Sequence, residues 1–176
     1  DTRSNLADSL SFAAPPPAVQ TVMDAWLKPP SYTGKPPILL TSPAMAERLR
    51  TEPEINVPEN SVLTLRITNA EKPAITFHEL GAMGEAGPEV TNLAPKTKFE
   101  NGLFQSETPL TRPVVVKVTD GSSTVANWQV TLIPDAPPTV SITETPTGSG
   151  AGVLSMKWKA ADDYGVTGIT SELSLA

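Results

Sequence analysis

The chain has 176 residues, including 19 prolines and 11 glycines but no cysteine, and its formal net charge is −6. The lack of cysteine excludes a disulfide scaffold, a thiolate metal site and a cysteine nucleophile. The negative charge disfavours nucleic acid and anionic membrane surfaces as partners, and the sequence has no apolar run of about 18 residues that could span a membrane.

The first 18 residues are expected to be a lead-in or linker, because three consecutive prolines at 15–17 favour an extended spacer. The pattern typical of β-structure begins at Val19, and we expect one domain over residues 19–134. Its first strands are predicted at residues 22–27 and 38–40.

One helix signal follows. Ser42 is a good N-cap, Pro43 suits the first helical position, and Met45 and Leu49 are four residues apart on one face. The sequence therefore predicts one or two helical turns over residues 42–50, lying over the end of a sheet.

Alternating apolar residues then predict a series of strands. Single strands are expected at 61–68 and 74–80, and hairpins at 97–107 and 114–133. The first hairpin turns at an Asn-Gly pair, which accepts positive φ at both positions. About seven short strands with turn signals between them predict an all-β fold, an immunoglobulin-like antiparallel β-sandwich.

A proline-rich joint at residues 134–138 separates this domain from a second unit, residues 135–176. Strands are predicted at 139–143, 154–160 and 166–175. The unit is much shorter than the ~100 residues of a complete sandwich, so it is interpreted as a partial, truncated immunoglobulin-like unit. Three strands cannot bury their own apolar faces, and we expect them to pack on the first domain or on a partner chain.

The three tryptophans, Trp26, Trp128 and Trp158, are expected in the core because they lie on patterned strands. A sugar-binding platform would require them to share an exposed face. The single histidine, His78, is expected on the solvent side of its strand. A catalytic base is the alternative, and it would need an activated nucleophile nearby.

Asp162 and Asp163 are adjacent carboxylates at a turn. They are a weak candidate for a calcium site, since calcium prefers oxygen ligands. The alternative is turn structure, in which an Asp side chain accepts from the backbone two residues on and Gly165 supplies the required φ.

Tyr32 lies in a proline-rich segment that could dock in an aromatic groove. The alternative packs Tyr32 over the sandwich edge, where the prolines block edge pairing.

Three segments carry a family resemblance. Residues 24–37 contain PP-x-YTG-x-PP, residues 57–63 resemble VP-x-GS-x-L with Asn60 in place of glycine, and residues 159–166 contain A-x-DDYGV. These motifs are similar to those of a group of bacterial envelope proteins, best known from alphaproteobacteria and catalogued as a domain of unknown function. The resemblance implies a membrane-anchored parent protein with N-terminal transmembrane helices, immunoglobulin-like periplasmic units and a long low-complexity C-terminal part. It brings no established catalytic residues.

These observations predict a non-catalytic structural or protein-interaction module in the periplasm, with no cofactor and no catalytic residue. Its interaction candidates are Trp26, Tyr32 and Tyr164. We expect a protein partner or self-association, no nucleic acid, and contact with the membrane only through parts of the parent protein outside this chain. The alternative function is a carbohydrate- or peptidoglycan-binding β-sandwich, for which a glycan is the ligand, and a hydrolase is a distant third.

Overall fold

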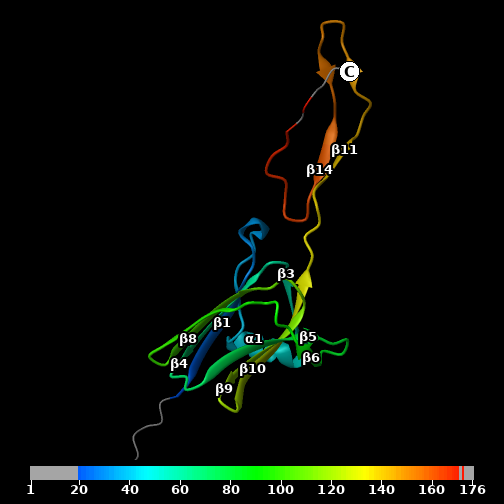
Figure 1. Ribbon diagram of the computed structural model, residues 1–176. Helices are drawn as coiled ribbons and strands as arrows, with labels where there is room; N and C mark the ends of the chain where they lie inside the picture. Colours follow the sequence, from blue (N-terminus) through cyan, green and yellow to red (C-terminus); the bar gives the residue numbers. More distant parts are fainter. Residues whose placement is uncertain (1–19, 171, 173–176) are drawn as a thin grey trace, which may run out of the picture.

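The computed structural model describes residues 20–170 and 172. The expected lead-in over residues 1–18 and most of the last six residues lie outside this range. The described chain forms a sandwich of two five-stranded sheets, from which a narrow extension rises (Figure 1). The all-β sandwich predicted from the sequence is confirmed.

The first sheet has the spatial order β2–β1–β4–β8–β7 and is antiparallel throughout. Its strands are β1 (Val22–Lys28), β2 (Ile38–Leu39), β4 (Val62–Thr68), β7 (Lys96–Glu100) and β8 (Leu103–Pro109). The β7–β8 hairpin turns at Asn101 and Gly102, whose φ values are 51° and 74°. Positive φ at both central residues gives the turn the twist that a hairpin needs, as predicted.

The second sheet has the order β3–β10–β9–β5–β6. Its strands are β3 (Glu54–Pro58), β5 (Pro73–Leu80), β6 (Ala86–Glu89), β9 (Val114–Asp120) and β10 (Ser123–Ile133). The expectation of a wholly antiparallel sandwich is wrong at one pair, because β3 runs parallel to β10. The sequence analysis placed no strand at β3, whose alternation covers only Glu54 to Val57 and ends at Pro58.

The core lies between the two sheets, and strands such as β1, β4 and β8 contribute alternate residues to it. Leu63, Leu65 and Ile67 of β4 are buried, while the residues between them face outward. Val116 of β9 and Trp128 of β10 supply the opposite wall. The predicted core role of Trp128 is confirmed, since its exposed fraction is 6%.

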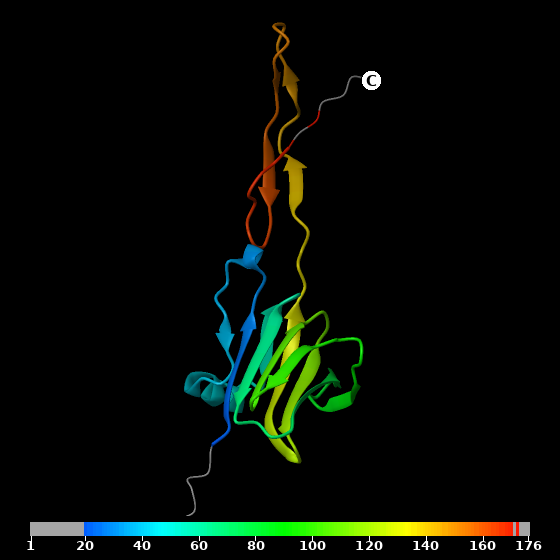
Figure 2. The same cartoon turned by 60° about the vertical axis from the view of Figure 1, so that its left-hand side comes forward.

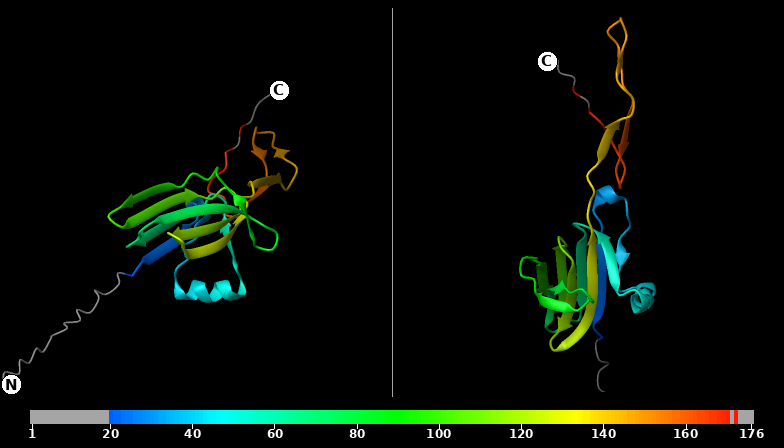
Figure 3. Two further views of the ribbon diagram at one scale, coloured as in Figure 1. Left: turned by 60° about the horizontal axis from the view of Figure 1, so that its bottom comes forward. Right: turned by 90° about the vertical axis from the view of Figure 1, so that its right-hand side faces the viewer.

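The helix α1 (Pro43–Thr51) begins where it was predicted. The Ser42 hydroxyl accepts a hydrogen bond from the Met45 amide at 3.2 Å, and Pro43 occupies the first turn. This satisfies one of the amides that a helix N-terminus leaves unpaired. The helix connects β2 to β3 beside the sandwich, which Figure 3 shows from two further directions.

Beyond Ile133 the chain leaves the sandwich and forms the extension, called here the arm and defined as residues 139–170. It contains β11 (Thr139–Ile142), β12 (Thr147–Gly148), β13 (Leu154–Ser155) and β14 (Trp158–Ala161). β11 pairs with β14 and β12 with β13, each pair antiparallel. Figure 2 shows the arm standing away from the sandwich along most of its length.

One expectation for this region is wrong, and of the two alternatives for its apolar faces, the first domain or a partner chain, packing on the first domain is not found. Residues 166–170 form no strand, although a third strand was predicted at 166–175. The apolar side chains of the arm also do not pack on the first domain: Val140, Ile142 and Trp158 are 62%, 58% and 51% exposed. The expected core role of Trp158 is therefore wrong as well.

Candidate functional site

Two of the predicted interaction residues, Tyr32 and Tyr164, meet where the arm approaches the sandwich. Their ring centroids are 5.6 Å apart at an interplanar angle of 74°, an edge-to-face contact. Tyr32 belongs to η1 (Ser31–Thr33) in the loop between β1 and β2, and the tip of this loop reaches the end of the arm nearest the sandwich (Figure 2). Tyr32 thus packs against the arm. The alternative from the sequence, in which Tyr32 packs over the sandwich edge, is not found. We call this contact the tyrosine junction.

The loop that presents Tyr32 is shaped by its own residues. The Pro30 carbonyl accepts from the Thr33 amide at 3.1 Å and from the Thr33 hydroxyl at 2.7 Å. Gly34 then adopts a left-handed φ of 62°, which ends the turn without strain from a Cβ atom. Pro30, Thr33 and Gly34 of the PP-x-YTG-x-PP motif therefore fix the turn and leave the ring of Tyr32 available for contact.

The turn that presents Tyr164 is fixed in a similar way. The Tyr164 amide donates to Asp162 Oδ2 at 3.1 Å, and Gly165 has a φ of 97°. This is the turn structure that the sequence analysis set against a calcium site. Within residues 20–170 and 172, no group of three or more His, Cys, Asp or Glu side chains is placed to hold a metal, so Asp162 and Asp163 belong to no such group.

Charges surround the tyrosine junction. Lys35 Nζ lies 5.3 Å from the centre of the Tyr164 ring, in a cation–π arrangement. Desolvation is the main cause that raises the pKa of Tyr32 above 10.0, and the negative charge of Asp135 in the joint adds to it. The pKa of Tyr164 is raised by desolvation and then by Asp163 and Asp135. Exposed aromatic and cation–π pairs contribute roughly 0.5–1 kcal/mol each, so the junction biases the orientation of the arm.

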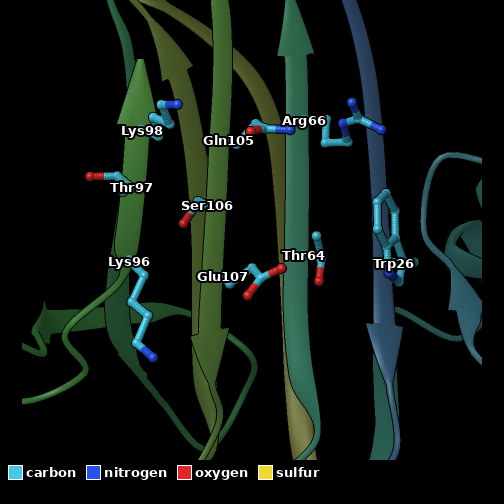
Figure 4. A pocket seen from close by; sticks show the side chains of 9 residues that line it. All are labelled: Trp26, Thr64, Arg66, Lys96, Thr97, Lys98, Gln105, Ser106 and Glu107. Carbon is cyan, nitrogen blue, oxygen red and sulfur yellow. The ribbon is translucent and has the colours of Figure 1, made fainter. Parts of the chain in front are cut away.

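Trp26, the third interaction candidate, lies elsewhere. The buried residues of β1 are Ala25 and Leu27, so Trp26 faces outward from the first sheet and is only half-buried. The expected core role of Trp26 is therefore wrong. Its ring borders an open groove of about 450 Å³ across β1, β4, β8 and β7 (Figure 4).

The groove is lined by two rows of outward-facing side chains, set by the strand register. One row runs Trp26–Thr64–Glu107–Lys96, because each residue is paired directly with the next across neighbouring strands. The second row, in the same way, runs Asp24–Arg66–Gln105–Lys98, of which Asp24 lines the neighbouring hollow rather than the groove itself. A second hollow of about 400 Å³ lies on the other side of Trp26 and Arg66 and reaches Leu39, Thr41 and Ser42.

The arm carries an apolar face that follows from its register. Val140 is opposite Ala160 and Ile142 is opposite Trp158, so these four residues share one face of the β11–β14 pair. The other face carries Ser141 and its partner Lys159. Eight of the 14 exposed large hydrophobic residues in the described chain belong to the arm. An alternating pattern of this kind is typical of strands with one buried face, yet no described residue covers it.

His78 has a structural environment. Its Nδ1 lies 3.1 Å from the Gly87 carbonyl oxygen, which can only accept, so Nδ1 carries the proton. Its Nε2 lies 3.2 Å from the Thr76 hydroxyl, which then donates. The Nδ1 contact joins β5 to β6, and the Nε2 contact stays within β5, so both ring nitrogens are engaged.

Sequence comparison places the chain in a family. The model of the DUF4175 family, a domain of unknown function, matches residues 1–176, and the chain belongs to this family. Comparison with curated proteins and with solved structures gave no match. In the described part of the chain, no helix is long and apolar enough to cross a membrane.

Proposed function

We propose that this chain is a non-catalytic structural and protein-interaction module in the periplasm, part of a membrane-anchored bacterial envelope protein. The observation that carries the proposal is the apolar face of the arm. Its period-two pattern is that of a buried sheet face, and burying it requires a further protein layer. The periplasmic and membrane-anchored setting is supported by the three motifs described above and by nothing else.

The partner of this face is expected to be protein β-structure, either a second copy of the chain or another envelope protein. Each fully buried side chain of the size of Val, Ile or Trp contributes roughly 1.5–3 kcal/mol on leaving water. Val140, Ile142 and Trp158 are 51–62% exposed, so association would gain about half of this from each, whereas the polar face of the same strands gains little from burial. The tyrosine junction supports a structural role, because it biases the arm toward an orientation in which its apolar face stays accessible.

A pair of neighbouring substitutions tests the proposal. Val140→Lys places a charge on the apolar face, and Ser141→Lys places the same charge on the opposite face of the same strand. Self-association is measured by sedimentation velocity over a range of concentrations. Association with another protein is measured by photocrosslinking from position 142 in bacterial envelopes, identification of the product, and titration of the two purified proteins.

The proposal predicts that Val140→Lys weakens the association by at least about tenfold and that Ser141→Lys leaves it unchanged. A tenfold loss corresponds to about 1.4 kcal/mol, which the lost burial of Val140 and the cost of burying a charge supply together. If the chain stays monomeric and yields no crosslinked protein that binds after purification, or if both variants behave alike, the arm is not an interaction surface.

A further inference from the structure

We propose that the groove beside Trp26 is a binding site for a neutral oligosaccharide. This inference goes beyond the proposed function, because it concerns the outer face of the sandwich and does not involve the arm. It rests on three observations: a half-buried indole at one end of the groove, two rows of mixed hydrogen-bonding groups, and the absence of internal partners for most of those groups.

The indole supplies the surface on which a sugar ring packs. A pyranose has an apolar face of C–H groups and a rim of hydroxyls, so it binds best where an aromatic ring lies beside polar side chains. Trp26 is placed in this way because β1 turns Ala25 and Leu27 inward. Figure 4 shows its ring at the edge of the groove, with the Arg66 side chain extending toward β1 beside it.

The rows supply both donors and acceptors. A sugar hydroxyl donates one hydrogen bond and accepts others, so a site for it needs both kinds of group within a short distance. Glu107 and Asp24 only accept, Arg66 and Lys96 only donate, and Thr64 and Gln105 do both. These groups alternate along the rows, so a ligand hydroxyl at most positions lies near both a donor and an acceptor.

These side chains are free to bind a ligand. Lys96 is opposite Glu107 and Asp24 is opposite Arg66, yet among residues 20–170 and 172 none of the four takes part in a salt bridge or side-chain hydrogen bond. Only Lys98 is engaged, with Glu100 at 3.0 Å. Binding a sugar therefore requires few internal contacts to be broken.

Charge and size select the ligand class. The cations Arg66, Lys96 and Lys98 are accompanied by one carboxylate in each row, Glu107 or Asp24, and the chain carries a net charge of −6, so a polyanion would be repelled at both carboxylates and at long range. A volume of about 450 Å³ falls within the range of ligand sites, which is about 300–1,000 Å³. From β1 to β7 the groove crosses three strand intervals, about 14 Å in all, and it continues past Trp26 into the second hollow. This favours a chain of sugars over a single one.

The test uses the full chain and two defined probes, the tetramer of β-1,4-linked N-acetylglucosamine and cellotetraose, titrated by calorimetry and by NMR. We expect at least one to bind, and Trp26→Ala to weaken that binding by about tenfold or more, while Trp26→Phe retains part of it. Arg66→Ala and Gln105→Ala, in the neighbouring row, are expected to weaken binding several-fold. Lys117→Ala on the other sheet is the matched control for Arg66→Ala and is expected to leave binding unchanged.

Thermal melting of each variant separates loss of binding from loss of fold. If Trp26→Ala unfolds, the two variants of the neighbouring row decide the question. The proposal is overturned if neither probe binds at millimolar concentration, or if binding persists unchanged in folded Trp26→Ala or in both row variants. None of these results bears on the arm, so the proposed function stands or falls separately.

Discussion

The two tryptophans Trp128 and Trp158 make a sharp test of the fold, because they lie on similarly patterned strands but in opposite environments. Trp128 is 6% exposed within the sandwich core, whereas Trp158 is 51% exposed on the arm. Replacing each by alanine should therefore give very different results.

Trp128→Ala removes a large aromatic side chain from a packed core, which typically costs about 3–5 kcal/mol in the free energy of unfolding. For a domain of this size, each kcal/mol lowers Tm by about 4 °C. We expect Tm of the sandwich to fall by about 12–20 °C. Trp158→Ala truncates a half-exposed side chain on a two-stranded sheet outside the sandwich, so it should change the sandwich stability by no more than about 0.5 kcal/mol.

Far-UV circular dichroism follows both transitions without relying on tryptophan fluorescence, which the substitutions alter. The measurement is made at low protein concentration, because self-association through the arm would stabilise the chain by mass action. Should Trp158→Ala lower Tm as much as Trp128→Ala at every concentration, the apolar face of the arm would be packed against the sandwich in solution. The exposed face on which the proposed function depends would then not exist.

Three further predictions follow from local contacts. Ser42→Ala removes the helix cap on the Met45 amide and should cost about 1 kcal/mol, seen in chemical unfolding and absent from an exposed serine variant such as Ser122→Ala. The Asp120 carboxylate accepts from two backbone amides of the β4–β5 turn at 2.6–3.2 Å. Asp120→Ala removes these hydrogen bonds and should lower the free energy of unfolding by about 1–2 kcal/mol. Asp120→Asn retains one acceptor oxygen and should cost less. The raised pKa values of Tyr32 and Tyr164 mean that the unfolded chain loses these protons first, so their contribution to stability is present below pH 10 and falls as pH rises further. Between pH 9 and pH 11, Tm should fall less in the double variant Tyr32→Phe and Tyr164→Phe than in the chain without substitutions. An equal fall in Tm would contradict this prediction.

Much of the sandwich could be predicted because local sequence patterns mark its strands, turns and helix start. Residues 62–68 alternate apolar and polar side chains, and the structure buries the apolar set. The Asn-Gly pair at 101–102 specifies positive φ at both positions, and the structure has it there. Ser42 and Pro43 specify a helix start. Each of these signals is local, so the rest of the fold is not needed to interpret it.

The missed features depend on contacts between distant segments. β3 is five residues long, and its parallel pairing with β10, about 75 positions further along, leaves no local signal beyond the short alternation from Glu54 to Val57. Trp26 was expected in the core because it lies on a patterned strand, although its position in that pattern, out of phase with Ala25 and Leu27, already indicates an outward direction. The polar rows of the groove could not be predicted, because they come from four strands whose order the sequence does not state.

The tyrosine junction shows the same limit at the level of motifs. Residues 29–37 and 159–166 were both singled out from the sequence, and the second segment was predicted to turn at Asp162 to Gly165, as it does. Their meeting in space was not predicted, because about 130 residues and an entire sandwich lie between them. The contact is made by Tyr32 of one motif and Tyr164 of the other. Neither tyrosine ring is needed to form its own turn.

The separation of the three surfaces determines what each experiment can show. The groove lies on the outer face of the first sheet, the tyrosine junction lies where the arm approaches the sandwich, and the apolar face lies on the arm itself (Figures 1 and 4). Substitutions at sites with no shared partners are expected to act additively. A double variant of Trp26→Ala and Val140→Lys should therefore lose both binding activities by the same factors as the single variants. A departure from additivity would mean that the arm and the groove are coupled, and the tyrosine junction is the physical connection through which such coupling would pass.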